Sequence, residues 1–443
     1  MTHAKRRILA KRVSFCPGTG SGGANGLLDS TFLSSRPDAH TMLATLRFQV
    51  GLLTTLQALL LINNATLIAV NVLAGLHLTS DKMLASIPVT SYVIGSAVWS
   101  MPAAAVMRRF GRRAGYTLGS VAAIVSALVA FWAMTIESLP LLCLGTFLCG
   151  IYNAFGASLR FAAADVADTY DPGFKARAIS LVLTGGLIGG IVGPEISKWS
   201  RTWLSHQFAG TYAVLMLFGL MSLALIQLLR IAPPAGPVQG GEARPLSVIL
   251  RQPAAILAIA SAALSYGVMN LLMVATPLAM EVCSLSFNQT VFVLQWHVIG
   301  MFAPGLITGS LITRWGILPI MVVGVVLNAA CVVVALSGVE LMHFSIALFL
   351  LGVGWNFMYT SGTALLTRCY RPAEKNKVQG FMDMSVFGVM ITSSAASGAL
   401  LFVNGWSVLN LLSLPFVLVC LAGAVWVARE TGWSIGRVAR TTP

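Results

Sequence analysis

Amide side chains recur inside long apolar stretches of this chain, where hydrogen-bonding chemistry is scarce. They are Asn63, Asn64, Asn153, Asn270 and Asn356. Asn64 and Asn270 are 206 residues apart, and Asn153 and Asn356 are 203 apart. An amide donates and accepts hydrogen bonds without a fixed charge, which suits binding of a neutral polar or heteroaromatic solute. The alternative is hydrogen bonding between helices that stabilises a bundle.

Aromatic rings accompany these amides. Tyr152, Trp355 and Tyr359 lie within one helical turn of them, and Trp296 lies in a polar cluster at 295–297. Rings at this depth are too far from the membrane surface to belong to an interfacial belt, so they could stack on a planar ligand. Plain core packing is the alternative. We include all four rings among the predicted substrate-binding residues.

Three titratable side chains are predicted to couple transport to protons. Glu195 follows a Gly-Pro pair, His297 lies in an apolar stretch, and Asp383 lies one turn into another. Ionisable groups inside a membrane are costly and usually serve a function. The alternatives are interfacial exposure for Glu195, a structural hydrogen bond for His297, and a salt bridge from Asp383 to Lys377 or Arg113.

Catalytic and cofactor motifs are not found in the sequence. It has no Gly-rich phosphate loop that ends in Lys-Ser or Lys-Thr, and its seven Cys lack zinc or redox spacing. Its six His are scattered, at positions 3, 40, 77, 206, 297 and 343. We therefore expect no metal, no cofactor and no enzymatic activity. A membrane-embedded enzyme and a receptor built on a transporter fold are the less favoured alternatives.

The composition is typical of a chain embedded in lipid. Hydrophobic residues make up 57% of the sequence, charged residues 9%, and mean hydropathy is +0.83, whereas soluble domains carry about 25% charged residues. Apolar stretches of about 20 residues without alternation predict helices. We expect an all-α polytopic membrane protein with twelve transmembrane helices, at 48–75, 84–107, 114–135, 139–163, 178–198, 209–230, 253–277, 289–312, 317–338, 344–367, 379–402 and 407–428.

The net charge of +14 is unevenly distributed. With the N-terminus inside, every Lys and Arg falls in a cytoplasmic segment except Lys82, Lys198 and Arg201 in outer loops and Arg160 within a span. This positive-inside pattern predicts that both termini are cytoplasmic, and it explains the basic charge without nucleic-acid binding. Arg160 either extends to the lipid headgroups or pairs with Asp165.

The chain repeats itself after about 200 residues. Tyr152-Asn153 returns as Trp355-Asn356, and Tyr-Asp-Pro at 170–172 returns as Tyr-Arg-Pro at 370–372. A Pro- and Gly-rich linker separates six spans from six, so both repeats enter the membrane in the same direction. The predicted organisation is a disordered cytoplasmic tail (1–44, with translation starting at Met1 or Met42), a six-helix bundle (45–231), a central cytoplasmic loop (232–252), a second bundle (253–430) and a cytoplasmic tail (431–443).

The loop after the second span resembles a signature of the major facilitator superfamily, Gly, three residues, Asp, Arg, any residue, Gly, Arg, Arg. Arg109, Gly111, Arg112 and Arg113 match it, while Arg108 replaces the acidic residue. The acidic position helps latch the two halves in this superfamily, and this loop lacks that acidic residue.

Two further segments extend the resemblance over nearly the whole chain from about residue 45. The loop after the eighth span keeps Gly309, Arg314 and Gly316 of the same signature. Gly189 to Pro194 resembles a fifth-span pattern of proton-linked exporters, although close helix packing explains these glycines equally well. We treat both basic loops as predicted gating loops.

The resemblance implies a transporter that works by alternating access, with spans 1, 4, 7 and 10 lining its cavity. The paired blocks around Trp355-Asn356 and Gln379-Gly380 look like a bacterial subgroup with links to riboflavin uptake. We therefore expect a monomeric protein of the bacterial inner membrane whose partners are a small-molecule substrate and the lipid bilayer. Facilitated diffusion and proton coupling both remain open, and the main alternative is a proton-linked exporter of drugs or metabolites.

Overall fold

The computed structural model describes residues 39–171, 174–231 and 244–433. Within these ranges the chain is helical and contains no strand. A helix satisfies its own backbone hydrogen bonds, as lipid requires, and the predicted all-α membrane architecture is confirmed. The predicted disordered tail up to residue 38, the central linker at 232–243 and the last ten residues lie outside the described residues.

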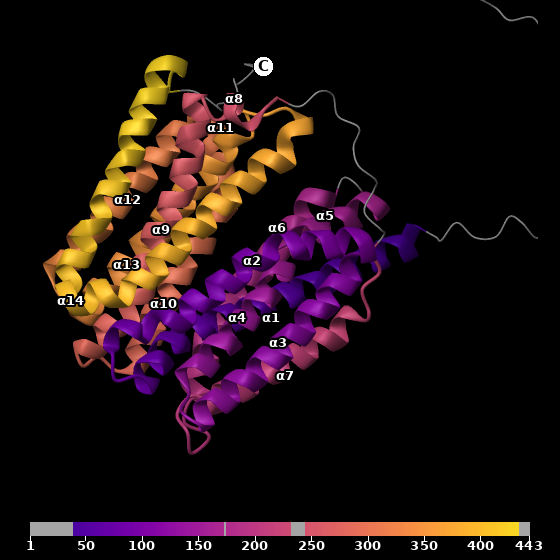
Figure 1. Cartoon of the computed structure of the whole chain (residues 1–443). Helices are drawn as coiled ribbons and strands as arrows, with labels where there is room; N and C mark the ends of the chain where they lie inside the picture. Colours follow the sequence, from indigo (N-terminus) through magenta and orange to yellow (C-terminus); the bar gives the residue numbers. More distant parts are fainter. Residues whose placement is uncertain (1–38, 172–173, 232–243, 434–443) are drawn as a thin grey trace, which may run out of the picture.

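The first bundle contains the helices of the N-terminal half. Figure 1 shows them lying side by side in one body, with α1 against α6 and α4 between α2 and α3. The elements are α1 (Ala39–Leu78), the short 3-10 helix η2 (Lys82–Ser86), α2 (Ile87–Phe110), α3 (Arg112–Thr135), α4 (Leu139–Gly156), α5 (Leu159–Tyr170), α6 (Lys175–Ser200) and α7 (Ala209–Ile226).

The second bundle contains the helices of the C-terminal half. In it α9 packs against α14 and α13, and α12 packs against α13. The elements are α8 (Leu246–Ile249), α9 (Pro253–Val282), α10 (Phe287–Phe302), α11 (Gly305–Trp315), α12 (Ile317–Ser337), α13 (Leu341–Leu366), the short η4 (Pro372–Glu374) and α14 (Lys375–Thr431).

The described residues include eleven helices long and apolar enough to cross a membrane, and the last of them is two spans in one. Gly405 interrupts α14 with φ 81° and ψ 171°, a conformation that favours glycine because it has no Cβ. The helix turns back there in Figure 1. Its two arms contain the predicted spans 379–402 and 407–428, so the described residues contain twelve segments that can cross a membrane.

Two predicted spans are broken in the middle. The fourth consists of α4 and α5, separated at Ala157 and Ser158, and the eighth consists of α10 and α11, separated at Ala303 and Pro304. Ser158 donates its hydroxyl to the Phe155 carbonyl at 3.0 Å, which competes with helical bonding. Pro304 has no N–H to donate. Each pair of helices still forms one segment long and apolar enough to cross a membrane, so the predicted spans 139–163 and 289–312 are confirmed, with a break inside each that the sequence did not predict.

Matching glycines make the turns within the two basic loops. Gly111 joins α2 to α3 with φ 85°, and Gly316 joins α11 to α12 with φ 101°. The residue before each glycine is aromatic, and an arginine guanidinium lies over its ring, 5.3 Å from Phe110 and 5.9 Å from Trp315. The two halves therefore repeat the same local structure at this point.

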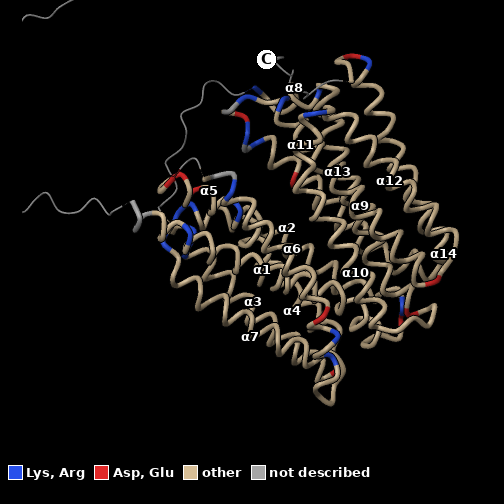
Figure 2. The backbone as a smooth tube through the Cα atoms, turned by 180° about the vertical axis from the view of Figure 1, so that it is seen from behind, with Lys and Arg blue, Asp and Glu red and all other residues tan. Residues whose placement is uncertain are grey.

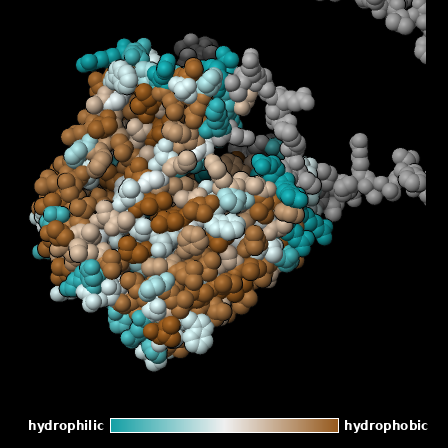
Figure 3. Space-filling model, in the orientation of Figure 1, coloured by the Kyte–Doolittle hydropathy of each residue, from teal (hydrophilic) through white to brown (hydrophobic). Residues whose placement is uncertain are grey.

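We call the end of the molecule that carries these two loops the basic end. Figure 2 shows most Lys and Arg there, close to where the described chain begins and ends. Lys82, Lys198 and Arg201 lie at the opposite end. Figure 3 shows hydrophobic side chains covering the flank between the two ends, as expected of a surface that contacts lipid.

Candidate functional site

The two bundles contact each other near the end opposite the basic one. Thr90 donates to Ser394 across the interface at 3.1 Å, and Gln295 donates to the Ile191 carbonyl at 2.9 Å. Gly190 of α6 faces Val298 of α10 so closely that a Cβ on the glycine would lie 2.3 Å from a Val298 methyl. We call this set of contacts the seal.

At the basic end the bundles separate. Figures 1 and 2 both show their ribbons diverging, and Figure 3 shows a recess between them. Each bundle has its own hydrophobic core there, one within residues 46–231 and one within 246–428. A third core contains residues of both halves and joins them nearer the seal. The recess is therefore open at one end and closed at the other.

A chain of side-chain hydrogen bonds crosses the first bundle. Asn64 donates to Asn153 at 2.8 Å, and Asn153 donates to Ser96 at 3.1 Å. Asn63 accepts a hydrogen bond from the Cys149 thiol at 3.0 Å. The Asn64 carbonyl oxygen is buried and has no partner among the described residues. Because buried polar atoms are nearly always satisfied, this oxygen can accept a hydrogen bond from a ligand or water.

The amides of the second bundle each bind one backbone carbonyl and one hydroxyl. Asn270 donates to the Met390 carbonyl at 3.1 Å and to Ser393 at 3.0 Å. Asn356 donates to the Met301 carbonyl at 2.7 Å and accepts from Thr308 at 2.7 Å. These last bonds bridge the break between α10 and α11. Each predicted amide therefore connects helices, and Asn64 and Asn153 are the two that are only partly buried.

Three rings form an aromatic cluster in the second bundle. Trp355 and Tyr359 are stacked, with centroids 5.3 Å apart and planes 9° apart. Tyr266 of α9 meets both edge-on, at 5.0 and 5.3 Å. Tyr266 was not among the predicted site residues, although its position one turn before Asn270 could have indicated it. Tyr266 and Tyr359 are partly exposed, whereas Trp355 is 6% exposed.

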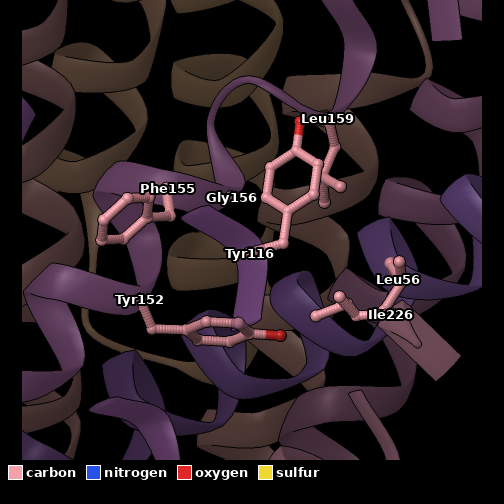
Figure 4. A pocket seen from close by; sticks show the side chains of 7 residues that line it. All are labelled: Leu56, Tyr116, Tyr152, Phe155, Gly156, Leu159 and Ile226. Atoms are coloured by element: carbon pink, nitrogen blue, oxygen red, sulfur yellow. The ribbon is translucent and has the colours of Figure 1, made fainter. Parts of the chain in front are cut away.

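Tyr152 points elsewhere, into the core of the first bundle. Its hydroxyl meets that of Ser222 at 3.1 Å. Figure 4 shows its ring on a small cavity of about 10 Å³, which is lined by Leu56, Tyr116, Tyr152, Phe155, Gly156, Leu159 and Ile226. That volume is about the least that one water needs. The cavity is too small for a solute, and Tyr152 does not join the other aromatic rings.

Trp296 and His297 also lie away from the aromatic cluster. Trp296 is 43% exposed, and its ring contacts Phe292 and Phe349 at 6.3 and 6.0 Å. His297 is fully buried, and its Nδ1 lies 2.7 Å from the Leu348 carbonyl. This contact fits the structural alternative for the histidine, because α10 and α13 are joined by it.

The two predicted carboxylates lie at different depths. Glu195 is at the seal, where Lys198 lies 3.4 Å away and Gln295 of the other half donates to it at 3.3 Å. Asp383 is exposed on α14 of the second bundle, and Arg160 is exposed on α5 of the first bundle. The two opposite charges therefore belong to different halves of the molecule.

The predicted gating loops bind within their own halves. Arg112 donates to Asp165 at 2.7 Å, so Asp165 pairs with this arginine and not with Arg160. Arg113 donates to Gln227 at 3.1 Å. Arg109 and Arg314 lie over the aromatic side chains that follow them. Among the described residues, no hydrogen bond or ion pair joins these loops to the other half.

One further ion pair was not anticipated. Arg244 donates to both oxygens of the buried Glu374, at 2.7 and 2.8 Å. Backbone N–H groups of Arg244 and Arg371 donate to the same carboxylate, at 2.9 and 2.8 Å. The hydrogen bonds from the Arg244 guanidinium hold the pKa of Glu374 well below its ordinary value, and those from the backbone act in the same sense. This pair fastens the end of the central linker to the start of α14.

Comparison with known proteins gives consistent results for family and fold. A model of the Major Facilitator Superfamily matches residues 53–355 and 262–439. The riboflavin transporter RfnT of Brucella anthropi is 39% identical over 390 residues, which cover 87% of this chain and 97% of that protein. The uncharacterised transporter YddS of Bacillus subtilis is 26% identical over 82% of this chain and 87% of its own length.

Two solved structures share the fold. A point mutant of the nucleoside transporter NupG superposes with a TM-score of 0.67 at 14% identity, covering 86% of this chain and 100% of that one. A bacterial homologue of the iron transporter ferroportin, in its outward-facing state, gives 0.60 at 13% identity, with coverage of 86% and 99%. At such identities the likeness concerns architecture alone.

Proposed function

Because the chain belongs to the Major Facilitator Superfamily and is a multi-pass membrane transporter of small molecules, we propose that it imports riboflavin across the bacterial inner membrane. The observation that carries this proposal is the 39% identity to riboflavin transporter RfnT over 97% of that protein. The site supports it, since uncharged amides and aromatic rings suit a neutral, planar heteroaromatic solute.

The direction of opening follows from the charge distribution. By the positive-inside rule the basic end faces the cytoplasm, and both termini lie there. The recess then opens inward, and the seal closes the path from outside. Alternating access requires the reverse state as well, in which the seal opens and the basic ends of the two bundles approach each other.

The substrate site in this proposal is the part of the recess between Asn64 and Asn153 of one half and the aromatic cluster of the other. Asn270 and Asn356 position the helices around it. Glu195 is the leading candidate for proton coupling, because protonation would remove the charge that Lys198 and Gln295 stabilise at the seal.

Riboflavin uptake in a bacterial riboflavin auxotroph tests the function. We expect the chain to restore growth at low external riboflavin and to give saturable uptake of the labelled vitamin. The Asn153→Leu variant should lose this uptake while keeping its level in the membrane, because leucine cannot replace either hydrogen bond. Asn404→Leu, an exposed position beside Gly405, is the matched control and should transport normally.

A proton-linked exporter is the second candidate, favoured by Glu195 at the seal and by the glycine pattern that precedes it. Riboflavin uptake equal to that of empty vector, together with raised resistance to toxic compounds, would favour export. Loss of uptake on adding a proton uncoupler would show coupling to protons, and its persistence would indicate facilitated diffusion.

A further inference from the structure

The rings of the aromatic cluster leave a surface on which a flat molecule can stack. Tyr359 lies parallel to Trp355, and of these two rings Trp355 is buried whereas Tyr359 is partly exposed. Tyr266 stands at 82° to the Tyr359 plane and is also partly exposed. Two rings at nearly a right angle form a corner that fits the face and the edge of one planar ligand, since aromatic pairs favour these two arrangements.

Two oppositely charged side chains, Arg160 and Asp383, lie near the corner formed by Tyr266 and Tyr359. Arg160 on α5 belongs to the first half, and it lies near enough to Tyr266, Tyr359 and Asp383 of the other half for its charge to interact with theirs. Both charged side chains are exposed. Within the described part of the chain neither forms an ion pair, although Arg160 lies 4.9 Å from the centre of the Phe161 ring. Their hydrogen-bonding capacity is therefore available to a ligand.

The two charges offer complementary hydrogen bonds. A guanidinium provides five N–H donors and no acceptor, whereas an ionised carboxylate only accepts. Because they belong to different halves and their charges sum to zero, they favour a solute that is uncharged and carries carbonyl acceptors together with N–H or O–H donors. A phosphorylated version of the solute would bring a dianion close to Asp383 without a net positive charge to offset its dehydration.

We propose that Tyr266 and Tyr359 hold the ring system of the substrate, and that Arg160 and Asp383 bind its polar groups from the two halves and select the free compound over its phosphate ester. This assignment rests on the proposed function, because riboflavin has the flat, uncharged ring system and the hydroxylated tail that it requires. It assigns the two partly exposed rings of the aromatic cluster to the ring system of the substrate, and it adds two charged residues to the substrate site.

Flavin fluorescence tests the stacking. A flavin that stacks on tyrosine or tryptophan loses its fluorescence, so titrating riboflavin with the purified full-length protein measures the Kd. We expect quenching by the wild type and a Kd raised about tenfold or more in Tyr359→Leu and Tyr266→Leu, since removing a stacked ring costs about that much. Tyr359→Phe keeps the ring and should bind within about twofold of wild type. Trp132→Leu, 55% exposed on α3, is the matched control and should leave the Kd unchanged.

Competition by the 5′-phosphate of riboflavin tests the charges. The wild type should bind the phosphate at least about tenfold more weakly than riboflavin. Asp383→Asn should weaken riboflavin binding and reduce the ratio between the Kd of the phosphate and the Kd of riboflavin. Arg160→Gln should also weaken riboflavin binding but should not reduce this ratio. Glu430→Gln and Arg429→Gln, exposed at the end of α14, are controls for a change of charge alone.

The outcomes separate the two proposals. This assignment would be overturned if the wild type takes up riboflavin and quenches its fluorescence while Tyr359→Leu and Asp383→Asn keep the wild-type Kd. The proposed riboflavin transport would then still hold. Absence of both uptake and quenching in the wild type would overturn the proposed function and this assignment with it. Unfolding midpoints of the variants close to that of the wild type confirm that the changed affinities do not come from misfolding.

Discussion

Replacing Gly190 by alanine should hold the transporter open at the seal. The new Cβ would lie 2.3 Å from Cγ1 of Val298, whereas carbon atoms in contact are about 3.5 Å apart or more. The two helices must therefore separate by about 1.2 Å, or Val298 must leave its rotamer. Overpacking of this kind costs about 1–3 kcal/mol. Since Gly190 and Val298 belong to different halves, the cost falls on the closed seal alone.

A penalty of that size changes the balance between the two states by about 5–150-fold, since 1.4 kcal/mol is a factor of ten. We expect riboflavin uptake to fall at least about fivefold. Opening of the seal is measured with Ser394→Cys, a fully buried position, and a membrane-impermeant thiol reagent. Cys143 and Cys283, which are partly exposed near this end, are replaced by serine beforehand. Labelling of intact cells should become faster in Gly190→Ala.

Two controls make this prediction specific. Gly186→Ala lies one turn earlier on α6, where a Cβ would meet its nearest neighbours, atoms of Gln57, at an ordinary 3.5 Å, so uptake and labelling should stay normal. Val298→Ala removes the obstructing methyl groups and should restore uptake when combined with Gly190→Ala. Equal behaviour of Gly190→Ala and Gly186→Ala would refute the steric reasoning.

Three further predictions concern stability, measured as the thermal unfolding midpoint of the purified protein. Glu374→Gln should lower the unfolding midpoint, because it removes the carboxylate that Arg244 stabilises. Since the pKa of Glu374 is depressed in the folded state, the difference in midpoint between variant and wild type should be full above about pH 5.5 and should shrink as the pH falls below 4.5. A difference in midpoint that does not change with pH would contradict this account. Asp165→Asn and Arg112→Gln should each lower the unfolding midpoint by a similar small amount, because each removes one partner of the same ion pair. The double variant should lower the midpoint no more than either single variant does, which a double-mutant cycle checks. Gly405→Ala should destabilise by about 1–2 kcal/mol because a side chain at φ 81° is strained, and an unchanged midpoint would show that the turn between the arms relaxes freely.

Helix identity and the repeat were predictable from the sequence because both depend on local pattern. Apolar length fixes where a helix crosses lipid, and equivalent positions such as Gly111 and Gly316 perform the same turn in both halves. The breaks at Ser158 and Pro304 were missed. Mean hydropathy over a window does not detect one side-chain hydrogen bond, such as that from Ser158 to the Phe155 carbonyl, or one missing backbone N–H, as at Pro304.

The candidate site was predictable only in part. Amide positions could be located, but their partners depend on how helices from distant parts of the sequence pack, as the bond from Asn64 to Asn153 shows. Tyr152 was grouped with Trp355 because the repeat aligns them, yet their rings face different neighbours. The pairing of Asp165 with Arg112 in preference to Arg160 likewise follows from tertiary geometry.

The separate cores at the basic end bear on how such a protein can be built. Residues 46–231 and 246–428 each bury their own side chains there, while the shared core lies toward the seal. A polypeptide cut within the linker should therefore still yield two pieces that insert independently and reassemble through the seal. Fusion of two once-separate genes would have required no new hydrophobic core at the basic end, because a linker between two folded bundles is sufficient there.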